Sequence, residues 1–327
     1  MHSLSDPLGV RTASRFVMDR SRHVRIDQPR VHEVAQQIIN TPSLPQATSW
    51  SADHLGELEL TDDEIANFVL VLDALNFYFW GDPRWKVAWE GTSHNGYQAL
   101  VYALRRALLE GYPITDATYL ATIPAADVAH ILRGESVIPL FSSRVHNLRE
   151  AGQSLVREHN GRFLDCVRQA ENSGPELLRR VISLFPSFID VRTCDGRTIP
   201  FYKRAQILVG DLSAAFESRG EVLFDDLSFL TAFADYKVPQ VLHQLGVLRY
   251  SSELEQKLIR REHIPAGDPF EVEIRAATII AVDNITLSTI VREIPVPSAV
   301  VDWYLWNLGR HWDFERLPYH RTPTIAY

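Results

Sequence analysis

The stretch "TAFADYKVPQVLHQLG" (231–246) predicts where one helix begins and ends. From Val238 to Leu245 its apolar residues recur at i, i+3, i+4 and i+7, the spacing of one helical face. Pro239 fits the first turn, where its missing N–H has no intrahelical bond to lose. We therefore predict a helix from about residue 238 to Gly246.

The residues that follow predict a turn and a second helix. "LGVL" (245–248) reverses the chain, and Ser252 with Glu255 has the spacing of a helix cap. Asp235 lies just before the first helix, where the helix dipole favours an ionised carboxylate. The unit is thus a helix–hairpin–helix preceded by an acid. A capping role alone would explain Asp235.

Helical periodicity extends over most of the chain. "TDDEIANFVLVLDALNFYF" (61–79) opens with Thr61 and Glu64 at the spacing of a capping box. "DPFEVEIRAATIIAVDNI" (268–285) begins with Asp268 as a cap and Pro269 at the first helical position. The other predicted helices are 94–112, 124–134, 173–185, 201–218 and 297–312.

Evidence for strands is confined to two short stretches, "WKVAWEG" (85–91) and "FIDVRTCDG" (188–196), the second ending in an Asp-Gly turn signal. The fold class is therefore all-α, with at most a few short strands. We expect residues 1–50 to form an N-terminal extension with a first helix, and 51–327 to form one α-helical unit. That unit could have two lobes with a loose boundary near 141–160, a polar segment that could equally be one exposed helix.

The composition limits the class of protein. The net charge is −8, whereas proteins that bind duplex nucleic acid usually carry a basic face, so we expect no duplex partner. The two cysteines make no disulfide framework, and the 12 histidines lack the spacing of zinc ligands. No apolar run approaches the ~20 residues of a membrane helix, and the N-terminus lacks the core of a signal peptide. We expect a cytoplasmic protein with no metal, no cofactor and no membrane partner; the oligomeric state stays open.

Three charged residues stand at positions that suggest a site. Lys203 and Lys237 are two of only four lysines among 33 basic residues, and both lie where a helix is predicted to begin. A helix start with basic donors can bind an anion, although each lysine could equally be solvated. Asp302 lies in the apolar segment "VVDWYLWNLG" (300–309), where a carboxylate is costly unless it is paired or receives donors from a ligand. A solvent-facing acid on an amphipathic helix is the alternative.

Five stretches in this order carry a resemblance: "LNFYFW", "FYKRAQILVGDL", "FADYKVPQVLHQLGVLRYS", "DPFEVEIRAATI" and "DWYLWNLG". Together they resemble the queuosine salvage protein family, whose members are queuosine 5′-phosphate N-glycosylases that release the base queuine. The resemblance runs from about residue 50 to the C-terminal "PYHRTPTIAY". It implies an all-α fold whose core is like that of the helix–hairpin–helix DNA glycosylases.

The resemblance also implies site residues. The family's catalytic aspartate falls on Asp235, and Phe233 of the same motif would line the base pocket. Contacts from the last helix map onto Asp302, Trp303 and Asn307, where Asn307 replaces an expected carboxylate. His54, ahead of the "LNFYFW" helix, matches a further substrate contact. Lys203 and Lys237 are expected as phosphate ligands from their charge rather than from the family.

The implied reaction is hydrolysis of queuosine 5′-phosphate to queuine and ribose 5-phosphate. Breaking the C1′–N bond builds an oxocarbenium-like sugar, which an ionised Asp235 beneath C1′ would stabilise. Queuine is a 7-deazaguanine, and a carboxylate such as Asp302 can accept hydrogen bonds from its guanine-like edge. Two alternatives remain: a DNA-repair-type glycosylase, which would need a basic groove, and a non-catalytic nucleobase-binding module in which Asp235 is only a cap.

Overall fold

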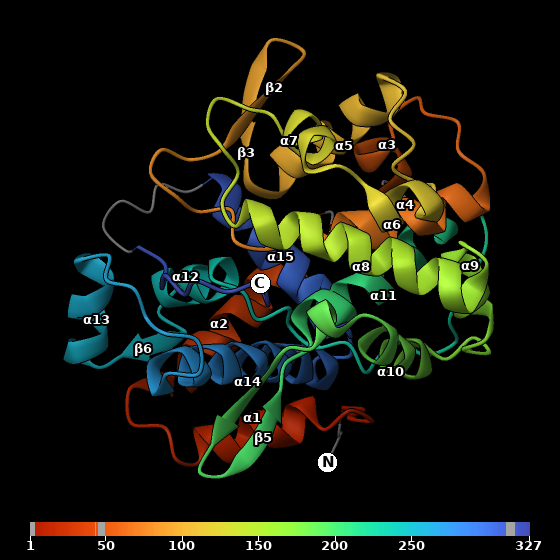
Figure 1. Cartoon of the computed structure of the whole chain (residues 1–327). Helices are drawn as coiled ribbons and strands as arrows, with labels where there is room; N and C mark the ends of the chain where they lie inside the picture. Colours follow the sequence, from red (N-terminus) through yellow and green to blue (C-terminus); the bar gives the residue numbers. More distant parts are fainter. Residues whose placement is uncertain (1–3, 43, 45–49, 312–317) are drawn as a thin grey trace.

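The computed structural model describes residues 4–42, 44, 50–311 and 318–327, which are mainly helical (Figure 1). Its α-helices are α1 (Val10–Met18), α2 (Gln28–Ile39), α3 (Trp50–His54), α4 (Asp62–Ala74), α5 (Gly96–Leu109), α6 (Ala117–Thr122), α7 (Ala125–Ile131), α8 (Phe141–His159), α9 (Phe163–Arg168), α10 (Gly174–Leu184), α11 (Lys203–Glu217), α12 (Lys237–Gln244), α13 (Ser252–Ile259), α14 (Pro269–Val291) and α15 (Ser298–His311). A short 3₁₀ helix, η2, spans Pro186–Phe188. The predicted fold class is confirmed.

Three antiparallel strand pairs complete the described part of the chain. They are β1 (Val24–Ile26) with β6 (Leu248–Tyr250), β2 (Lys86–Trp89) with β3 (Thr92–Asn95), and β4 (Val191–Cys194) with β5 (Arg197–Pro200). Asp195 and Gly196 join the last pair, and both have positive φ, as the Asp-Gly turn signal requires. The two predicted strands are therefore present, each as one arm of a hairpin.

Local capping sets several helix starts as predicted. Thr61 and Glu64 form the reciprocal capping box of α4. Asp268 accepts a hydrogen bond from the N–H of Phe270, and Pro269 begins α14. The cap of α13 is shifted by one residue from the prediction, because Ser251 rather than Ser252 accepts the N–H of Leu254.

The predicted helix at 238–246 is α12, and Gly246 follows it with a φ of 75°. The chain then enters β6, which pairs with β1 near the N-terminus before α13 begins. This segment is therefore tied to residues more than 200 positions earlier in the chain. The likeness of this unit to the DNA-glycosylase hairpin stays a prediction.

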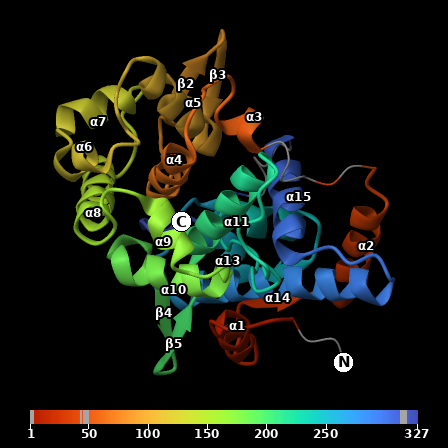
Figure 2. The same ribbon diagram turned by 90° about the vertical axis from the view of Figure 1, so that its right-hand side faces the viewer.

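Buried apolar side chains form two core clusters. One joins α3–α11, and the other joins α1, α2 and α12–α15. Figures 1 and 2 show α4–α8 on one side of the molecule and α14 with α1 on the opposite side, with α11 and α15 between them. The segment 141–160, a candidate boundary in the sequence, is helical from Phe141 to His159 and belongs to the first cluster. The chain passes between the clusters at residues 229–235, where Phe233 belongs to the first and Ala234 to the second.

The 23-residue helix α14 is long and apolar enough to meet the length and hydropathy criteria for a membrane span. It is also the central helix of the second cluster: it packs against α1, α2, α12 and α15, and 72% of its most apolar window is buried.

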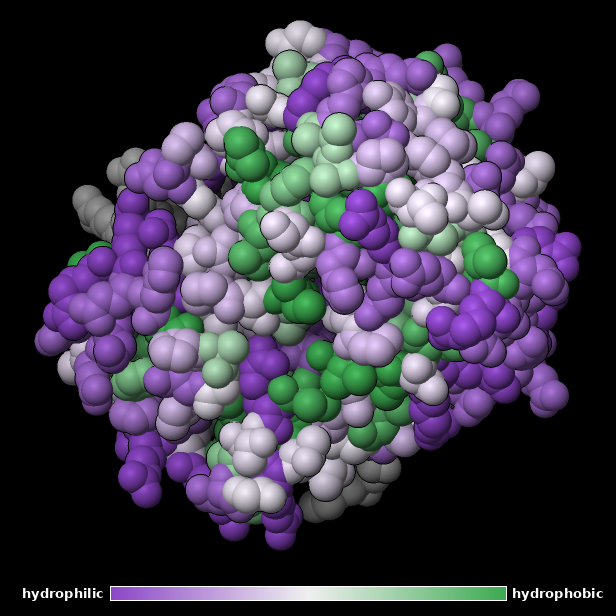
Figure 3. Space-filling view, viewed as in Figure 1, coloured by the Kyte–Doolittle hydropathy of each residue, from purple (hydrophilic) through white to green (hydrophobic). Residues whose placement is uncertain are grey.

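Figure 3 shows apolar side chains gathered over the middle of the face seen in Figure 1, around the point where the last residue lies, with hydrophilic side chains around them.

Candidate active site

The segment between α11 and α12 crosses the junction of the two clusters without helical hydrogen bonds. Residues 229–234 are all buried, so their backbone groups need internal partners. Side chains provide them. Arg11 donates to the carbonyls of Phe229 and Leu230, Gln206 accepts the N–H of Thr231, Asp302 accepts the N–H of Phe233, and Arg275 donates to the carbonyl of Ala234. Four helices therefore fix the backbone that leads to Asp235.

Asp235 has two carboxylate oxygens in different settings. Its Oδ1 accepts hydrogen bonds from the N–H groups of Lys237 (2.7 Å) and Val238 (3.0 Å), so it caps α12. Both bonds use Oδ1, which leaves Oδ2 without a hydrogen-bond partner among the described residues. Burial raises the pKa of this carboxyl, while Lys203 and the two N–H bonds oppose that rise. The capping role predicted from sequence is present, and it occupies one oxygen only.

Lys203, the first residue of α11, lies among carboxylates. Its side chain is buried, and its Nζ donates to the carbonyl of Asn76 at 3.3 Å. Burial lowers its pKa, and the negative charges of Asp235, Asp73 and Asp302 oppose that effect. Its surroundings are thus mainly acidic.

Asp302 belongs to this group of acids. It is 3% exposed, and its Oδ1 accepts the N–H of Phe233 at 2.9 Å. Burial first and the charge of Asp235 second raise its pKa well above the ordinary range. The solvent-facing alternative for Asp302 is therefore wrong. A buried acid beside a second acid is typical of a site whose two carboxyls carry different protonation states.

Two aromatic rings, those of Phe233 and Trp303, lie next to Gly210 of α11. The rings of Phe233 and Trp303 have their centroids 6.5 Å apart. Gly210 of α11 faces both: a Cβ added there would lie 3.8 Å from Phe233 Cζ and from Trp303 Cζ2. The absence of a side chain at Gly210 therefore lets α11 approach both rings closely. Aromatic rings of this kind can bind a planar group by stacking.

Lys237, the first residue of α12, is half-buried two residues after Asp235. Burial lowers its pKa to about 8, which Asp235 opposes and Arg84 reinforces. Its Nζ donates to Gln240, and its aliphatic stem packs against Gly309 of α15, where an added Cβ would lie 3.2 Å from Lys237 Cε. Asn307 is half-buried one helical turn after Trp303.

His54, the last residue of α3, is bonded through both ring nitrogens. Nδ1 lies 2.8 Å from the carbonyl of Trp50 and Nε2 lies 2.8 Å from the hydroxyl of Tyr97. Tyr97 in turn lies 3.3 Å from Asp211 Oδ2, and its ring contacts Trp306 of α15 edge-on. Burial lowers the pKa of His54 to about 4 and raises that of Asp211 to about 7. His54 is therefore neutral at pH 7 and linked to the last helix through Tyr97.

The structure thus brings together Asp235, Lys203, Asp302, Phe233 and Trp303, with Lys237 beside them, while His54 reaches this group through Tyr97. Sequence reasoning missed Asp73 and Asp211, which are buried on the faces of α4 and α11 next to Lys203. Each is an acid within an apolar helical stretch, the same signal that singled out Asp302. Among the described residues, no group of three His, Cys, Asp or Glu side chains has the geometry of a metal site.

Comparisons with known proteins point to one family. A family model described as "Queuosine salvage protein" matches residues 57–327. A protein named queuosine 5′-phosphate N-glycosylase/hydrolase from Sphaerobacter thermophilus is 47% identical over 324 residues, covering 98% of each chain. Proteins of the same name from Bos taurus and Mus musculus are 38% and 36% identical, over 97% and 99% of this chain and 98% and 100% of their own.

Proposed function

The chain belongs to the queuosine salvage protein family, and we propose that it hydrolyses the N-glycosidic bond of queuosine 5′-phosphate with Asp235 as its catalytic carboxylate. Members of the family are named as N-glycosylases, so the enzyme class follows from this membership. Neither alternative from the sequence, a DNA-repair glycosylase or a non-catalytic binding module, has support among the relatives. The observation that supports the catalytic assignment is that Asp235 Oδ1 accepts two hydrogen bonds, whereas Oδ2 has no hydrogen-bond partner within 4–42, 44, 50–311 and 318–327.

The reaction transfers the sugar from the base nitrogen to water. As the C1′–N bond breaks, positive charge gathers on the sugar, and Oδ2 of an ionised Asp235 stabilises it electrostatically. The same carboxylate can orient the attacking water and accept its proton. The departing base nitrogen takes up one proton from the solvent, so the whole reaction adds OH to C1′ and H to the base. Because Oδ1 is already held by two backbone N–H groups, the carboxylate does not need to reorganise during the reaction.

The aromatic rings and Asp302 are proposed to hold the base. Phe233 and Trp303 stack on its faces, and His54 and Asn307 complete the contacts that the family resemblance implies. Burial favours the protonated form of Asp302. The N–H donors of a guanine-like edge would replace the solvation that this carboxylate has lost, so binding the base would favour its ionised form.

The phosphate is proposed to lie on the side of Lys237, near the exposed Arg84, whose positive charge acts on Lys237. Lys203 is also retained as a candidate phosphate ligand. However, its acidic surroundings favour a second role, in which it keeps Asp235 ionised by opposing the effect of burial. The two roles make different predictions for a Lys203 variant, which are given below.

The function is tested by incubating the purified protein with queuosine 5′-phosphate in H₂¹⁸O and analysing the products by mass spectrometry. Hydrolysis predicts unlabelled queuine and ribose 5-phosphate that carries one ¹⁸O. Queuosine nucleoside serves as the second substrate, and a DNA duplex serves as the control for the glycosylase alternative. Stoichiometric binding of queuine without turnover of the nucleotide would contradict the proposal.

A further inference from the structure

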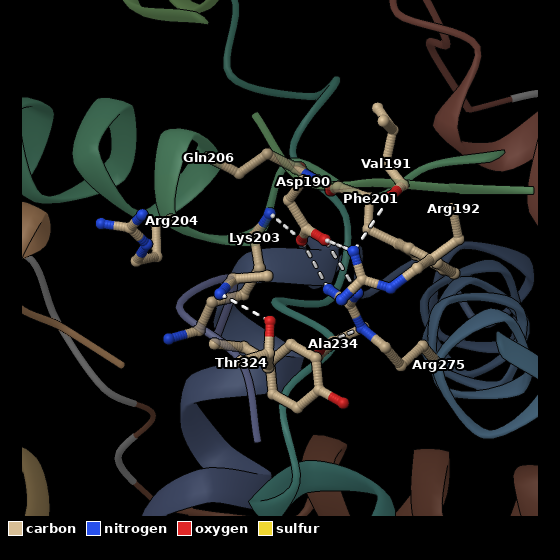
Figure 4. A network of polar contacts seen from close by, with 12 residues as sticks. Asp190, Val191, Arg192, Phe201, Lys203, Arg204, Gln206, Ala234, Arg275 and Thr324 are labelled. Atoms are coloured by element: carbon tan, nitrogen blue, oxygen red, sulfur yellow. Dashed lines mark hydrogen bonds and ion pairs between the residues drawn. The ribbon is translucent and has the colours of Figure 1, made fainter. Parts of the chain in front are cut away.

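One buried ion pair, Arg275 with Asp190, links the start of α11 to the end of the segment 229–235. Arg275 of α14 donates through Nη1 and Nη2 to the two oxygens of Asp190, at 2.9 and 2.6 Å, and through Nε to the carbonyl of Ala234 at 2.8 Å (Figure 4). Both side chains are almost fully buried. A single planar guanidinium thus holds a carboxylate and the peptide that precedes Asp235.

Asp190 fixes the residues at the other end of this link. Its Oδ2 accepts the N–H of Lys203 at 3.1 Å, and its main-chain carbonyl accepts the N–H groups of Phe201 and Tyr202. Tyr202 has a φ of 50°, a left-handed conformation that is costly for a tyrosine and persists only where the surroundings fix it. Asp190 therefore determines how α11 begins, and with it the place of Lys203.

The guanidinium is itself held rigidly. It lies between the rings of Phe201 and Tyr327, 4.1 and 4.2 Å from their centroids, and Glu271 accepts a further bond from Nη1 at 3.3 Å. Figure 4 shows Arg275 and Arg192 approaching Asp190 from one side and Lys203 lying on the other. Arg192 contacts the same two carboxylates, Asp190 and Glu271, and donates to the carbonyl of Val191, but within the described part of the chain it has no hydrogen bond to residues 229–235.

We propose that Arg275 and Asp190 are positioning residues that fix Asp235 relative to Lys203, so that the lysine charge acts on the catalytic carboxylate at a set distance. This proposal rests on the proposed role of Asp235. Neither residue needs to touch the substrate. Misplacement of a catalytic group by about 1 Å can cost about 10²-fold in rate, so loss of this link should reduce catalysis rather than substrate binding.

The test compares two identical substitutions within one network. Lysine has a single charged nitrogen and cannot reproduce a planar fork that contacts both Asp190 and Ala234. Arg275→Lys should lower kcat by about 10- to 100-fold and change KM by less than about threefold. Arg192→Lys alters contacts to the same two carboxylates but keeps the hydrogen bond from Arg275 to the Ala234 carbonyl. It should keep kcat within about twofold of the wild type.

Two further variants separate positioning from general destabilisation. Asn67 is a buried side chain that links Thr115, Gly161 and Phe163, away from the site. Asn67→Ala should lower the Tm and leave kcat unchanged, measured well below its Tm. In a background of Asp235→Asn, Arg275→Lys should lower the residual rate by less than about threefold, because the residue it positions is already disabled.

The proposal is overturned if Arg275→Lys keeps kcat within about twofold, or if its full effect persists in the Asp235→Asn background. Should Arg275→Lys fail to fold, Asp190→Asn takes its place with the same expected loss of kcat and the same criteria. If the wild type releases no queuine, the proposed function fails; the positioning claim is then decided by crystal structures of the wild type and Arg275→Lys. Unchanged positions of Lys203 and Asp235 would overturn it, and a shift between them would support it.

Discussion

Replacing Asp235 by asparagine separates the two roles of this side chain. Asparagine has the same shape, and its Oδ1 can accept the same two bonds from the N–H groups of Lys237 and Val238. Its Nδ2 would take the place of Oδ2, which removes the negative charge beneath the sugar. Asp235→Asn should therefore leave the helix cap intact and disable the reaction.

The two effects have different expected sizes. Asparagine and aspartate are about equal as N-caps, so the change in capping free energy should stay below about 0.5 kcal/mol. Burial raises the pKa of Asp235, so its ionised form costs folding free energy above that pKa, and asparagine removes this cost at neutral pH. The activation free energy should rise by at least about 2.7 kcal/mol, the loss of one transition-state contact, which lowers kcat by about 10²-fold or more.

The assay measures queuine release at saturating queuosine 5′-phosphate together with thermal unfolding of the same preparations. Asp235→Ala is the comparison that also removes the cap, and it should cost about 1 kcal/mol of unfolding free energy in addition to activity. Asp268→Asn is the control, because the Asp268 side chain also accepts a first-turn N–H, in this case at the start of α14. It should change neither the Tm nor kcat.

Two results would refute the reasoning. If Asp235→Asn keeps kcat within about threefold of the wild type, Asp235 is only a helix cap and another group stabilises the sugar cation. If Asp235→Asn lowers the Tm as much as Asp235→Ala does, the charge itself is needed for folding, and the division of labour between Oδ1 and Oδ2 is wrong.

Three further substitutions test the charges around this carboxylate. Lys237→Met should raise KM for queuosine 5′-phosphate by about 10-fold or more, because one charge-assisted hydrogen bond is lost. KM for the nucleoside should change little, and the ratio of kcat/KM on the two substrates measures this preference. Lys203→Met should raise the pKa of Asp235, so the acid limb of the pH–rate profile should move to higher pH. If the acid limb does not move and KM for the phosphorylated substrate rises instead, Lys203 is a phosphate ligand. Asp211 has its pKa raised to about 7, so its contribution to stability is complete below about pH 4 and is lost as the pH rises through 7. Between pH 4 and pH 8 the free energy of unfolding of Asp211→Asn, measured in urea, should therefore rise by up to about 4 kcal/mol relative to that of the wild type. If the difference between the two proteins does not change with pH, the raised pKa of Asp211 is wrong.

Helix positions were predictable because their signals are local. The capping box of Thr61 and the Asp268-Pro269 start both appear where the sequence predicts them. β3 was not predicted, since its sequence "TSHN" (92–95) has no apolar alternation and is a strand only because β2 pairs with it. The same holds for β1 and β6, which lie more than 200 residues apart and define each other.

The site was predictable only in part, for a physical reason. Local sequence predicts only a capping role for Asp235, and its proposed catalytic role depends on what lies beside Oδ2, which local sequence does not contain. The family resemblance implies the catalytic role, and the structure shows which side chains lie near Asp235. Asp190 and Arg275 are separated by 85 residues, so their ion pair leaves no local pattern. The one local signal was a charged Arg275 inside the apolar stretch "VEIRAATII" (272–280), where an arginine requires a buried partner.

The charges around Asp235 also constrain where the substrate phosphate can lie. The charges of Asp73, Asp235 and Asp302 act on the buried cation of Lys203, and burial raises the pKa of each of these acids. The charge of Asp211 adds to this rise at Asp73, and the charge of Asp235 adds to it at Asp302. Such a site favours a positive charge on the sugar more in the transition state than in the ground state, which is the condition for catalysis. An ionised Asp235 in this site also repels a phosphate.

An enzyme that accepts a 5′-phosphate must therefore hold that group outside the acidic cluster. Lys237 is half-buried and the positive charge of Arg84 acts on it, whereas Lys203 is buried among the acids. This separation implies that Lys237→Met changes the preference for phosphorylated substrate and Lys203→Met changes the pH dependence. If Lys203→Met instead abolished the preference for the phosphate, the phosphate would have to lie beside three carboxylates, and the electrostatic account of the site would fail.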